Sequence, residues 1–163
     1  MKTIRLVCAI ALATALVAAP ALADTTTWPS AKVSVDAPAG WTSTIKGNQV
    51  LLATAKGDIA VDFVTVPAGA AADAGGAAGR QLGKVMDKVT VKNNKPVTVN
   101  GMKGAMVDGT GTLKGAPVVW LLLILDTPAT DVDLMGIAIG VDSTVSAHKA
   151  DLDHIFNSLK PTG

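Results

Sequence analysis

The side chains best suited to metal or acid–base chemistry lie near the C-terminal end, where His148, Asp151 and His154 follow one another at three-residue spacing. The two histidines are six residues apart, about 240° around a helix, so they cannot bind one ion together. An Asp-x-x-His pair can supply half of a zinc site, but a complete site needs three or four ligands. We therefore predict no metal site, with His148 beside the core and His154 in solvent.

Three further aspartates, Asp126, Asp131 and Asp133, follow an apolar run and could gather around calcium. Calcium loops carry oxygen ligands at fixed spacings and a central glycine. This segment lacks that pattern, which favours a solvated turn.

Motifs for covalent catalysis or nucleotide binding are absent from the sequence. There is no G-x-S-x-G elbow, and Gly109-Thr110-Gly111 lacks the frame of a phosphate-binding loop. We interpret that triplet as a twisted or bulged strand. All 13 acidic residues are aspartates, and nothing marks two of them as a pair for glycoside hydrolysis. We therefore predict no catalytic residues and no cofactor.

The first 23 residues have the features of a secretory signal peptide. A basic start, MKTIR, precedes an apolar stretch, and Ala21-Leu22-Ala23 fits the small-x-small cleavage rule, so the mature chain should begin at Asp24. An uncleaved membrane anchor is the alternative, but it needs about 20 apolar residues and the stretch is shorter. We predict a secreted or periplasmic protein with no transmembrane span in the mature chain.

The composition of the mature chain limits its partners. Removing residues 1–23 takes away Cys8 and two basic residues, which leaves 12 basic and 13 acidic residues. Nucleic acid is not a predicted partner, because it calls for a clear basic excess. Without cysteine the mature chain has no disulfide and no thiolate metal site. Residues 24–163 have the length of one domain with its own core, and we predict a single α+β domain.

Alternating apolar residues and tight turns predict antiparallel strands. Val61 and Phe63 share one face of a strand, and Asn100-Gly101 favours a type I′ hairpin. Trp28 and Trp41 lie at strand margins, where large rings are expected to close the core rather than form a binding surface. The strands predicted in this way are 32–36, 41–46, 49–54, 59–66, 95–99 and 102–113.

The run VVWLLLILD at 118–126 is apolar up to its final aspartate, unlike a strand with one wet face. It suits a central strand covered on both faces. Leu122 and Leu123 are therefore predicted to point to opposite faces and to be buried. The next strand, 134–141, carries mostly small residues on one face, which lets a helix approach closely.

Two helices are predicted to cover the sheet. The second is expected to be capped by Asp142-Ser143-Thr144, to carry an apolar stripe from Val145 to Leu159 and to stop at Pro161. The Ala/Gly-rich residues 67–79 are interpreted as a frayed lead-in to the first helix. That helix has one stripe at helical spacing: Ala78, Leu82, Val85, Met86 and Val89.

These elements predict the fold class α+β. The expected architecture is a three-layer α/β/α sandwich with two main helices and a central antiparallel sheet of about six to eight strands.

Two segments resemble secreted and periplasmic domains of the PsbP/Mog-like fold, which include bacterial DcrB-like proteins. VSVDAPAGW at 33–41 resembles that family's strand and Pro-x-Gly-Trp corner, and HKADLDHIFNSLKP at 148–161 resembles its closing helix. The resemblance spans most of residues 30–161, and the Ala/Gly-rich segment departs from it. It implies a non-enzymatic domain that binds or helps to assemble other proteins.

Basic residues concentrate in one short segment, which is the predicted partner surface. Five of the mature chain's 12 basic residues fall within positions 80–95, with Asp87 as the only acid among them. We expect them on the outer face of the first helix and the loop after it: Arg80, Lys84, Lys88, Lys92 and Lys95.

Such a basic stripe is most often only a solvated face, but uneven charge can also steer an acidic partner. The predicted partner is therefore an acidic envelope or extracellular protein. Two alternative functions stay open, a small-molecule carrier with an internal pocket and a hydrolase. The sequence indicates no oligomeric state.

Overall fold

The structure, a computed structural model, describes residues 24–163. The predicted signal peptide, residues 1–23, lies outside the described residues.

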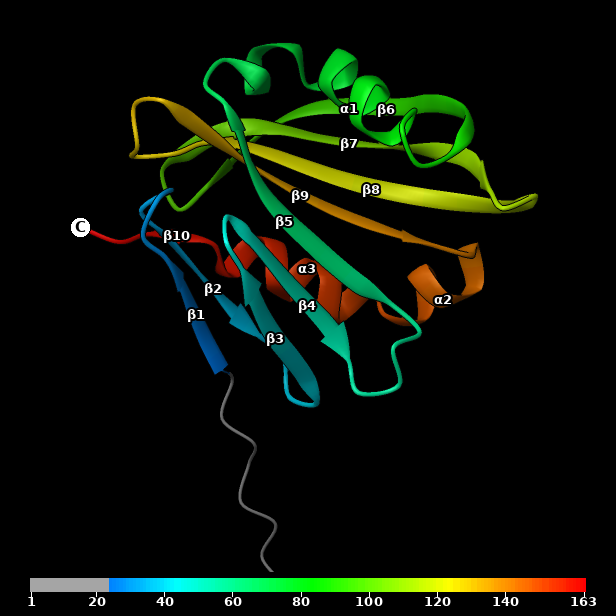
Figure 1. Cartoon of the computed structure of the whole chain (residues 1–163), viewed down its shortest axis with the longest axis horizontal. Helices are drawn as coiled ribbons and strands as arrows, with labels where there is room; N and C mark the ends of the chain where they lie inside the picture. The colour runs from blue at the N-terminus through cyan, green and yellow to red at the C-terminus, as the bar shows by residue number, and fades with distance from the viewer. Residues whose placement is uncertain (1–23) are drawn as a thin grey trace, which may run out of the picture.

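The central layer is a seven-stranded antiparallel sheet in the order β3-β4-β5-β9-β8-β7-β6 (Figure 1). Strands that follow one another in the chain lie side by side, except that β5 pairs with β9. The seven strands are β3 (Trp41–Lys46), β4 (Gln49–Thr54), β5 (Ala60–Pro67), β6 (Asp87–Val99), β7 (Met102–Leu113), β8 (Ala116–Asp126) and β9 (Val132–Gly140).

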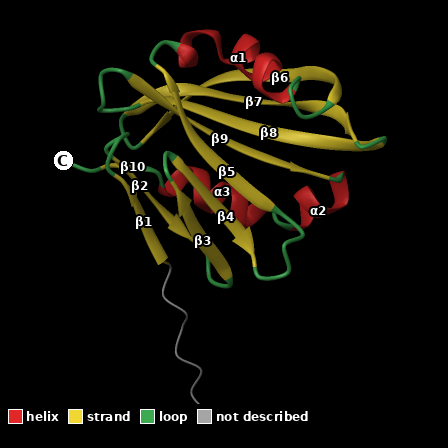
Figure 2. Cartoon of the chain, in the orientation of Figure 1, coloured by secondary structure: helices red, strands yellow, loops and turns green. Residues whose placement is uncertain are grey.

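Helices cover both faces of this sheet (Figure 2). One face carries the short helix η1 (Ala70–Asp73) and α1 (Ala74–Leu82). The other face carries α2 (Asp142–Ala147) and α3 (Lys149–Ser158), together with a small sheet of β1 (Asp24–Trp28), β2 (Val33–Ala37) and β10 (Lys160–Pro161). This arrangement confirms the predicted α+β sandwich. The small sheet was not predicted, because the strand that forms β2 was counted among the strands of one central sheet.

β8 is buried on both of its faces. Leu123 and Leu125 belong to the core shared with α3 and the small sheet, whereas Leu122 and Ile124 belong to the core under α1. Leu122 is 0% exposed and Leu123 is 1% exposed. The predicted opposite orientation of the two leucines is therefore confirmed.

β9 presents small residues to the layer that contains α2 and α3. A Cβ atom at Gly136 would lie 2.4 Å from the Phe63 ring and 3.2 Å from the Phe156 ring of α3. One at Gly140 would lie 3.1 Å from Val145 of α2. The predicted close helix approach is confirmed, since these aromatic and aliphatic groups occupy the space that larger β9 side chains would need.

The first helix lies earlier in the chain than predicted. α1 ends at Leu82 with Gly83 as its C-cap, so the Ala/Gly-rich residues expected as a frayed lead-in form the helix itself. Val85 is 58% exposed in the following turn, and Val89 lies in β6. The prediction of a helix through Val89 is wrong. The helical spacing is coincidental, because Met86 from the turn and Val89 from the strand pack against the same core as α1.

The second predicted helix is split in two at His148, whose φ of −101° and ψ of 14° interrupt the helix between α2 and α3. The predicted side-chain cap at Asp142-Ser143-Thr144 is wrong, because Val141 is the N-cap and no side-chain cap bond forms. The predicted apolar stripe is confirmed, with Leu152 and Ile155 buried in α3.

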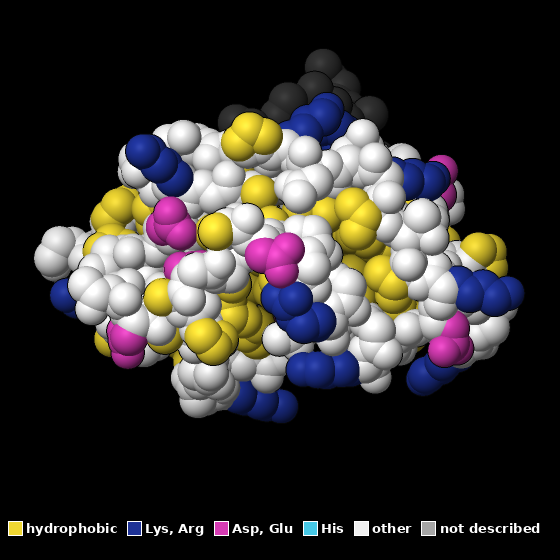
Figure 3. All heavy atoms as spheres, turned by 90° about the horizontal axis from the view of Figure 1, so that it is seen from above, with side chains coloured by type: hydrophobic (Ala, Val, Ile, Leu, Met, Phe, Trp, Pro, Cys, Tyr) yellow, Lys and Arg dark blue, Asp and Glu magenta, His cyan; other side chains and the backbone are white. Residues whose placement is uncertain are grey.

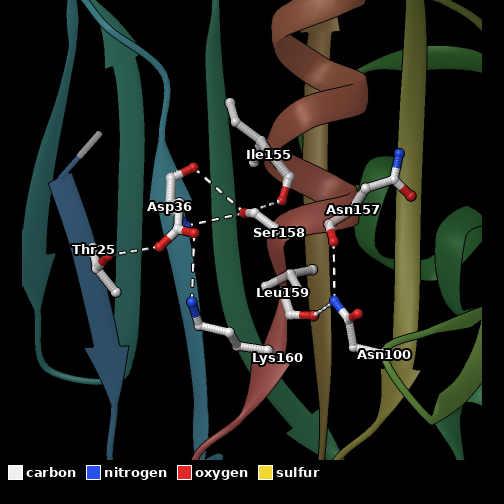
Figure 4. A network of polar contacts seen from close by, with 8 residues as sticks. All are labelled: Thr25, Asp36, Asn100, Ile155, Asn157, Ser158, Leu159 and Lys160. Atoms are coloured by element: carbon white, nitrogen blue, oxygen red, sulfur yellow. Dashed lines mark hydrogen bonds and ion pairs between the residues drawn. The ribbon is translucent and has the colours of Figure 1, made fainter. Parts of the chain in front are cut away.

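Polar contacts tie the C-terminal end of α3 to neighbouring strands (Figure 4). Asn100 Nδ2 donates to the carbonyl oxygens of Asn157 at 3.0 Å and Leu159 at 2.7 Å, and Ser158 Oγ accepts from the Asp36 amide at 3.0 Å. Asn100 has a positive φ of 47°, as the predicted type I′ turn requires. The β6–β7 turn therefore satisfies carbonyls that a helix end leaves without partners.

Candidate functional site

The predicted histidine–aspartate pair belongs to a polar cluster at the start of α3. His148 Nδ1 lies 3.3 Å from Asp151 Oδ2, and His148 Nε2 lies 3.3 Å from Asp58 Oδ2. The Trp41 indole donates to Asp151 Oδ2 at 3.2 Å, and its ring meets the imidazole edge-on with centroids 6.1 Å apart. His154 is exposed, as predicted. The cluster joins β3, the β4–β5 turn and α3.

Its electrostatics favour a protonated imidazole. The hydrogen bond to Asp151 does most to raise the pKa of His148, burial lowers it, and the hydrogen bond and charge of Asp58 raise it further. The hydrogen bond from Thr54 does most to lower the pKa of Asp58. Within residues 24–163, no group of three or more histidine and aspartate side chains is placed to hold a metal ion. The cluster can act as an ion-pair contact between segments.

This contact predicts pH-dependent stability. Folding raises the pKa of His148 above its ordinary 6.5, so the stabilisation is complete below that value and is lost as pH rises through the folded-state pKa. We expect the melting temperature of the wild type, relative to His148→Gln, to be steady at pH values below 6.5 and to fall as the pH rises above that value. His154→Gln, at an exposed site, serves as the control and should follow the wild type. A pH-independent difference between wild type and His148→Gln would contradict this assignment.

Asp133 has a structural role instead of the predicted place in a solvated turn. It is 3% exposed, and its Oδ2 accepts from the Ala71 amide at 2.9 Å. Burial raises the pKa of its carboxyl group. Asp126 is the last residue of β8 and Asp131 lies in the turn that follows. Both are exposed, so the solvated turn is confirmed for Asp131 alone. Asp133 thereby satisfies an amide at the start of η1, where helical amides lack partners.

The five basic residues lie on three segments and do not share one helix face. Arg80 is in α1 and forms an ion pair with Asp73 at 3.1 Å. Lys84 follows α1, and its ammonium donates to Gln81 Oε1 at 3.1 Å. The other three lie in β6, which is a free edge of the seven-stranded sheet: Lys88, Lys92 and Lys95. Their spacing therefore follows a turn and an edge strand.

Two of these lysines lie at irregularities of β6. The register against β7 slips between residues 87 and 90 and again between residues 91 and 93. Lys88 lies in the first slip and has a φ of 52°, and Lys92 is the extra residue in the second. Lys95 lies opposite Met106, which packs against the α3 side of the sheet. Bulges and lysines are both features that keep an open sheet edge from pairing with another strand.

An open groove beside the C-terminal end of α1 was not predicted from the sequence. It has a volume of about 440 Å³ and lies over β5 and β9 on the sheet face that carries α1. Figure 3 views the molecule from that side and shows apolar side chains gathered between polar ones. Most of the residues lining the groove are apolar, among them Val64, Leu82, Val85, Leu113, Ile137 and Ile139. The groove is open because α1 ends at Leu82.

Asp62 is the one charged residue among those lining this groove. Each of its carboxylate oxygens lies 2.8 Å from Gln49 Nε2. Burial raises the pKa of Asp62, and the bond from Gln49 acts in the opposite direction. The strand register places Asp62 between Leu51 of β4 and Ile137 of β9. The alternation of the strand predicts from sequence that Asp62 faces away from Val61 and Phe63. It cannot predict that the residues around Asp62 form a groove.

No helix within residues 24–163 combines the length and the apolar character that crossing a membrane requires.

Comparisons with known proteins support a fold and no closer relationship. No protein-family model matches the sequence, and no curated protein matches it. The chain is structurally similar to PsbP (CyanoP) from Synechocystis sp. PCC 6803, with a TM-score of 0.66 and 11% identity over 92% of this chain and 98% of that one.

Two other solved structures share the same architecture. LpqN of Mycobacterium tuberculosis, described as involved in cell envelope biogenesis, matches with a TM-score of 0.61 and 11% identity over 86% of each chain. The Ran-binding protein Mog1p of Saccharomyces cerevisiae matches with a TM-score of 0.58 and 8% identity over 86% of this chain and 95% of that one. At these identities the likeness concerns the fold alone. The chain has the PsbP/Mog-like fold.

Proposed function

We propose that this chain is a secreted or periplasmic protein-binding domain with an acidic partner. Residues 1–23 direct its export and are removed, and residues 24–163 act as one domain. The fold is compatible with such roles, since LpqN is described as involved in cell envelope biogenesis and Mog1p as Ran-binding. One fold can carry many functions, so the analogy with these proteins concerns the class of role alone. No catalytic residue is proposed.

The observation that carries the proposal is a row of lysines without carboxylate partners. Among the described residues, none of the ion pairs involves Lys84, Lys88, Lys92 or Lys95. All four are exposed, and three lie along the free edge β6. Because opposing charges do not neutralise them within the chain, they can attract an acidic surface.

Protection of the sheet edge is the competing explanation for these lysines. Edge strands commonly carry lysines and bulges that prevent aggregation, and β6 has both. Edge protection requires only that the edge be charged, whereas partner steering requires that binding depend on those charges and on salt. An experiment that neutralises the lysines separates the two.

The test compares two triple variants that change the same amount of charge. We expect Lys84→Gln/Lys88→Gln/Lys92→Gln to bind its partner more slowly at low salt, because steering acts on the association rate. The matched control, Lys32→Gln/Lys46→Gln/Lys56→Gln, changes three exposed lysines on other segments and should behave as the wild type. The measurement is the rate of capture of acidic envelope or extracellular proteins by each immobilised chain, at low and at high salt.

The melting temperatures and the capture rates of the two variants decide this prediction. Both variants should retain the melting temperature of the wild type, since all six side chains are exposed. Equal capture rates for the two variants at both salt concentrations would contradict partner steering and leave protection of the sheet edge as the role of Lys88 and Lys92.

A small-molecule carrier is the second candidate function. The open groove beside α1 supports it, although the groove lies on the surface and not inside the core.

A further inference from the structure

We infer that the groove beside the end of α1 binds a small molecule with an apolar body and a protonated amine. The inference goes beyond the proposed protein-binding function and gives the carrier candidate a class of ligand. It rests on residues other than Lys84, Lys88, Lys92 and Lys95. Either can therefore fail without the other.

The size and lining of the groove suit a small ligand. Its volume of about 440 Å³ falls within the roughly 300 to 1,000 Å³ typical of small-molecule sites. The floor is formed by β5 and β9 through Val64, Ile137 and Ile139, and one wall by Leu82 and Val85 at the end of α1. Val85 is 58% exposed and would be covered by an apolar ligand. Covering this surface supplies a hydrophobic driving force for binding.

Asp62 determines the charge of the ligand. A carboxylate offers about four lone-pair positions, and the single amide group of Gln49 can fill two of them. The remaining acceptor capacity lies in a groove whose lining contains no other charged residue. Partial burial has removed part of the water around this carboxylate, as the raised pKa of Asp62 reflects. A protonated amine would replace that water with a charge-assisted hydrogen bond.

One basic residue, Lys84, contacts the rim of the groove. Lys84 donates to Gln81, which is a lining residue, but Lys84 itself does not line the groove and is exposed. Solvent and salt screen an exposed ammonium far more than a half-buried carboxylate. The groove therefore discriminates against anions and neutral molecules in favour of cations.

Three probes with the same number of carbon atoms test which ligand charge the groove prefers. Hexylammonium, hexanol and hexanoate share a six-carbon chain and differ in the charge of the head group. Binding to the chain of residues 24–163 is measured by NMR titration, with the Gln49 side-chain amide and the Ile137 and Ile139 methyl groups as reporters of the site. We expect hexylammonium to bind most tightly, hexanol more weakly and hexanoate least.

The variants Asp62→Asn and Asp108→Asn test whether the charge of Asp62 contributes to binding. Asp62→Asn keeps the shape of the side chain and removes its charge, so we expect hexylammonium to bind about tenfold more weakly, which corresponds to a hydrogen bond to a charged group. Asp108 is the matched control, because it accepts from the Asn93 amide at 2.9 Å in a similar pair outside the groove. Asp108→Asn should bind hexylammonium as the wild type does.

The competing explanation is that Asp62 and Gln49 only satisfy each other across two strands. In that case hexanol would bind as well as hexylammonium, or Asp62→Asn would bind hexylammonium unchanged. Either result overturns the inference, and so does the absence of shifts at Gln49, Ile137 and Ile139 on titration with hexylammonium.

Discussion

Replacing Leu123 with aspartate is expected to prevent the chain from folding. Leu123 is 1% exposed and lies in the core between the sheet and α3. An unpaired buried charge costs several kcal/mol, against a total stability of about 5 to 15 kcal/mol for a domain. Leu122→Asp should have the same effect from the other face, because Leu122 lies in the core under α1. Circular dichroism and analytical size exclusion of the purified variants measure the outcome.

A matched control comes from an apolar residue on an edge strand. Ile45 lies in β3 and is 59% exposed, so Ile45→Asp introduces the same charge without burying it. We expect this variant to fold with nearly the stability of the wild type. A folded, monomeric Leu122→Asp protein would mean that the α1 face of β8 is accessible to water, which contradicts the two-sided burial of this strand.

Gly109→Ala is expected to destabilise the chain by about 3 kcal/mol or more, at the upper end of the cost of overpacking. A Cβ atom at this position would lie 1.9 Å from the Thr90 carbonyl oxygen and 2.5 Å from the Trp120 ring. The carbonyl belongs to the neighbouring strand β6, so it can move only if the bulged pairing between β6 and β7 changes. Urea unfolding with a fluorescence readout gives the change in the free energy of unfolding.

Gly79→Ala is the control, and we expect it to change the free energy of unfolding in the opposite direction. Gly79 lies in α1, and a Cβ atom there would have nothing within 4 Å. Alanine in a helix should therefore stabilise the chain by roughly 0.5 to 1 kcal/mol relative to glycine. If Gly109→Ala were as stable as the wild type, the strand pairing around Gly109 would differ from the one described.

Features set by local pattern were predicted well from the sequence. The unbroken apolar run around Leu122 and Leu123 predicts a strand with two covered faces, and Asn100-Gly101 predicts the β6–β7 turn. Both follow from backbone periodicity and turn chemistry, which act within a few residues. The triplet at Gly109 was interpreted as a twisted or bulged strand, and the register slips do occur at this place, in the partner strand β6.

Features set by tertiary packing were not predicted. The spacing of Leu82, Val85 and Met86 favours a helix, but the chain turns after Leu82, and Met86 packs on the core from a non-helical backbone. This difference also changes the expected site, because lysines predicted on one helix face lie on a turn and on an edge strand. The groove and the contact of Asp62 with Gln49 depend on where α1 ends and on strand register, which no local pattern contains.

Site-specific photo-crosslinking in cells that export the chain tests the proposed function most directly. A photoreactive residue would replace Lys92 on the β6 edge in one variant and Lys56 in the β4–β5 turn in the other, both at exposed positions. We predict that Lys92, but not Lys56, gives a crosslink to an acidic protein, and that the crosslink is lost when Lys84 and Lys88 are changed to glutamine. Equal crosslinking from both positions, or none from Lys92, would contradict a partner surface along the lysines of β6.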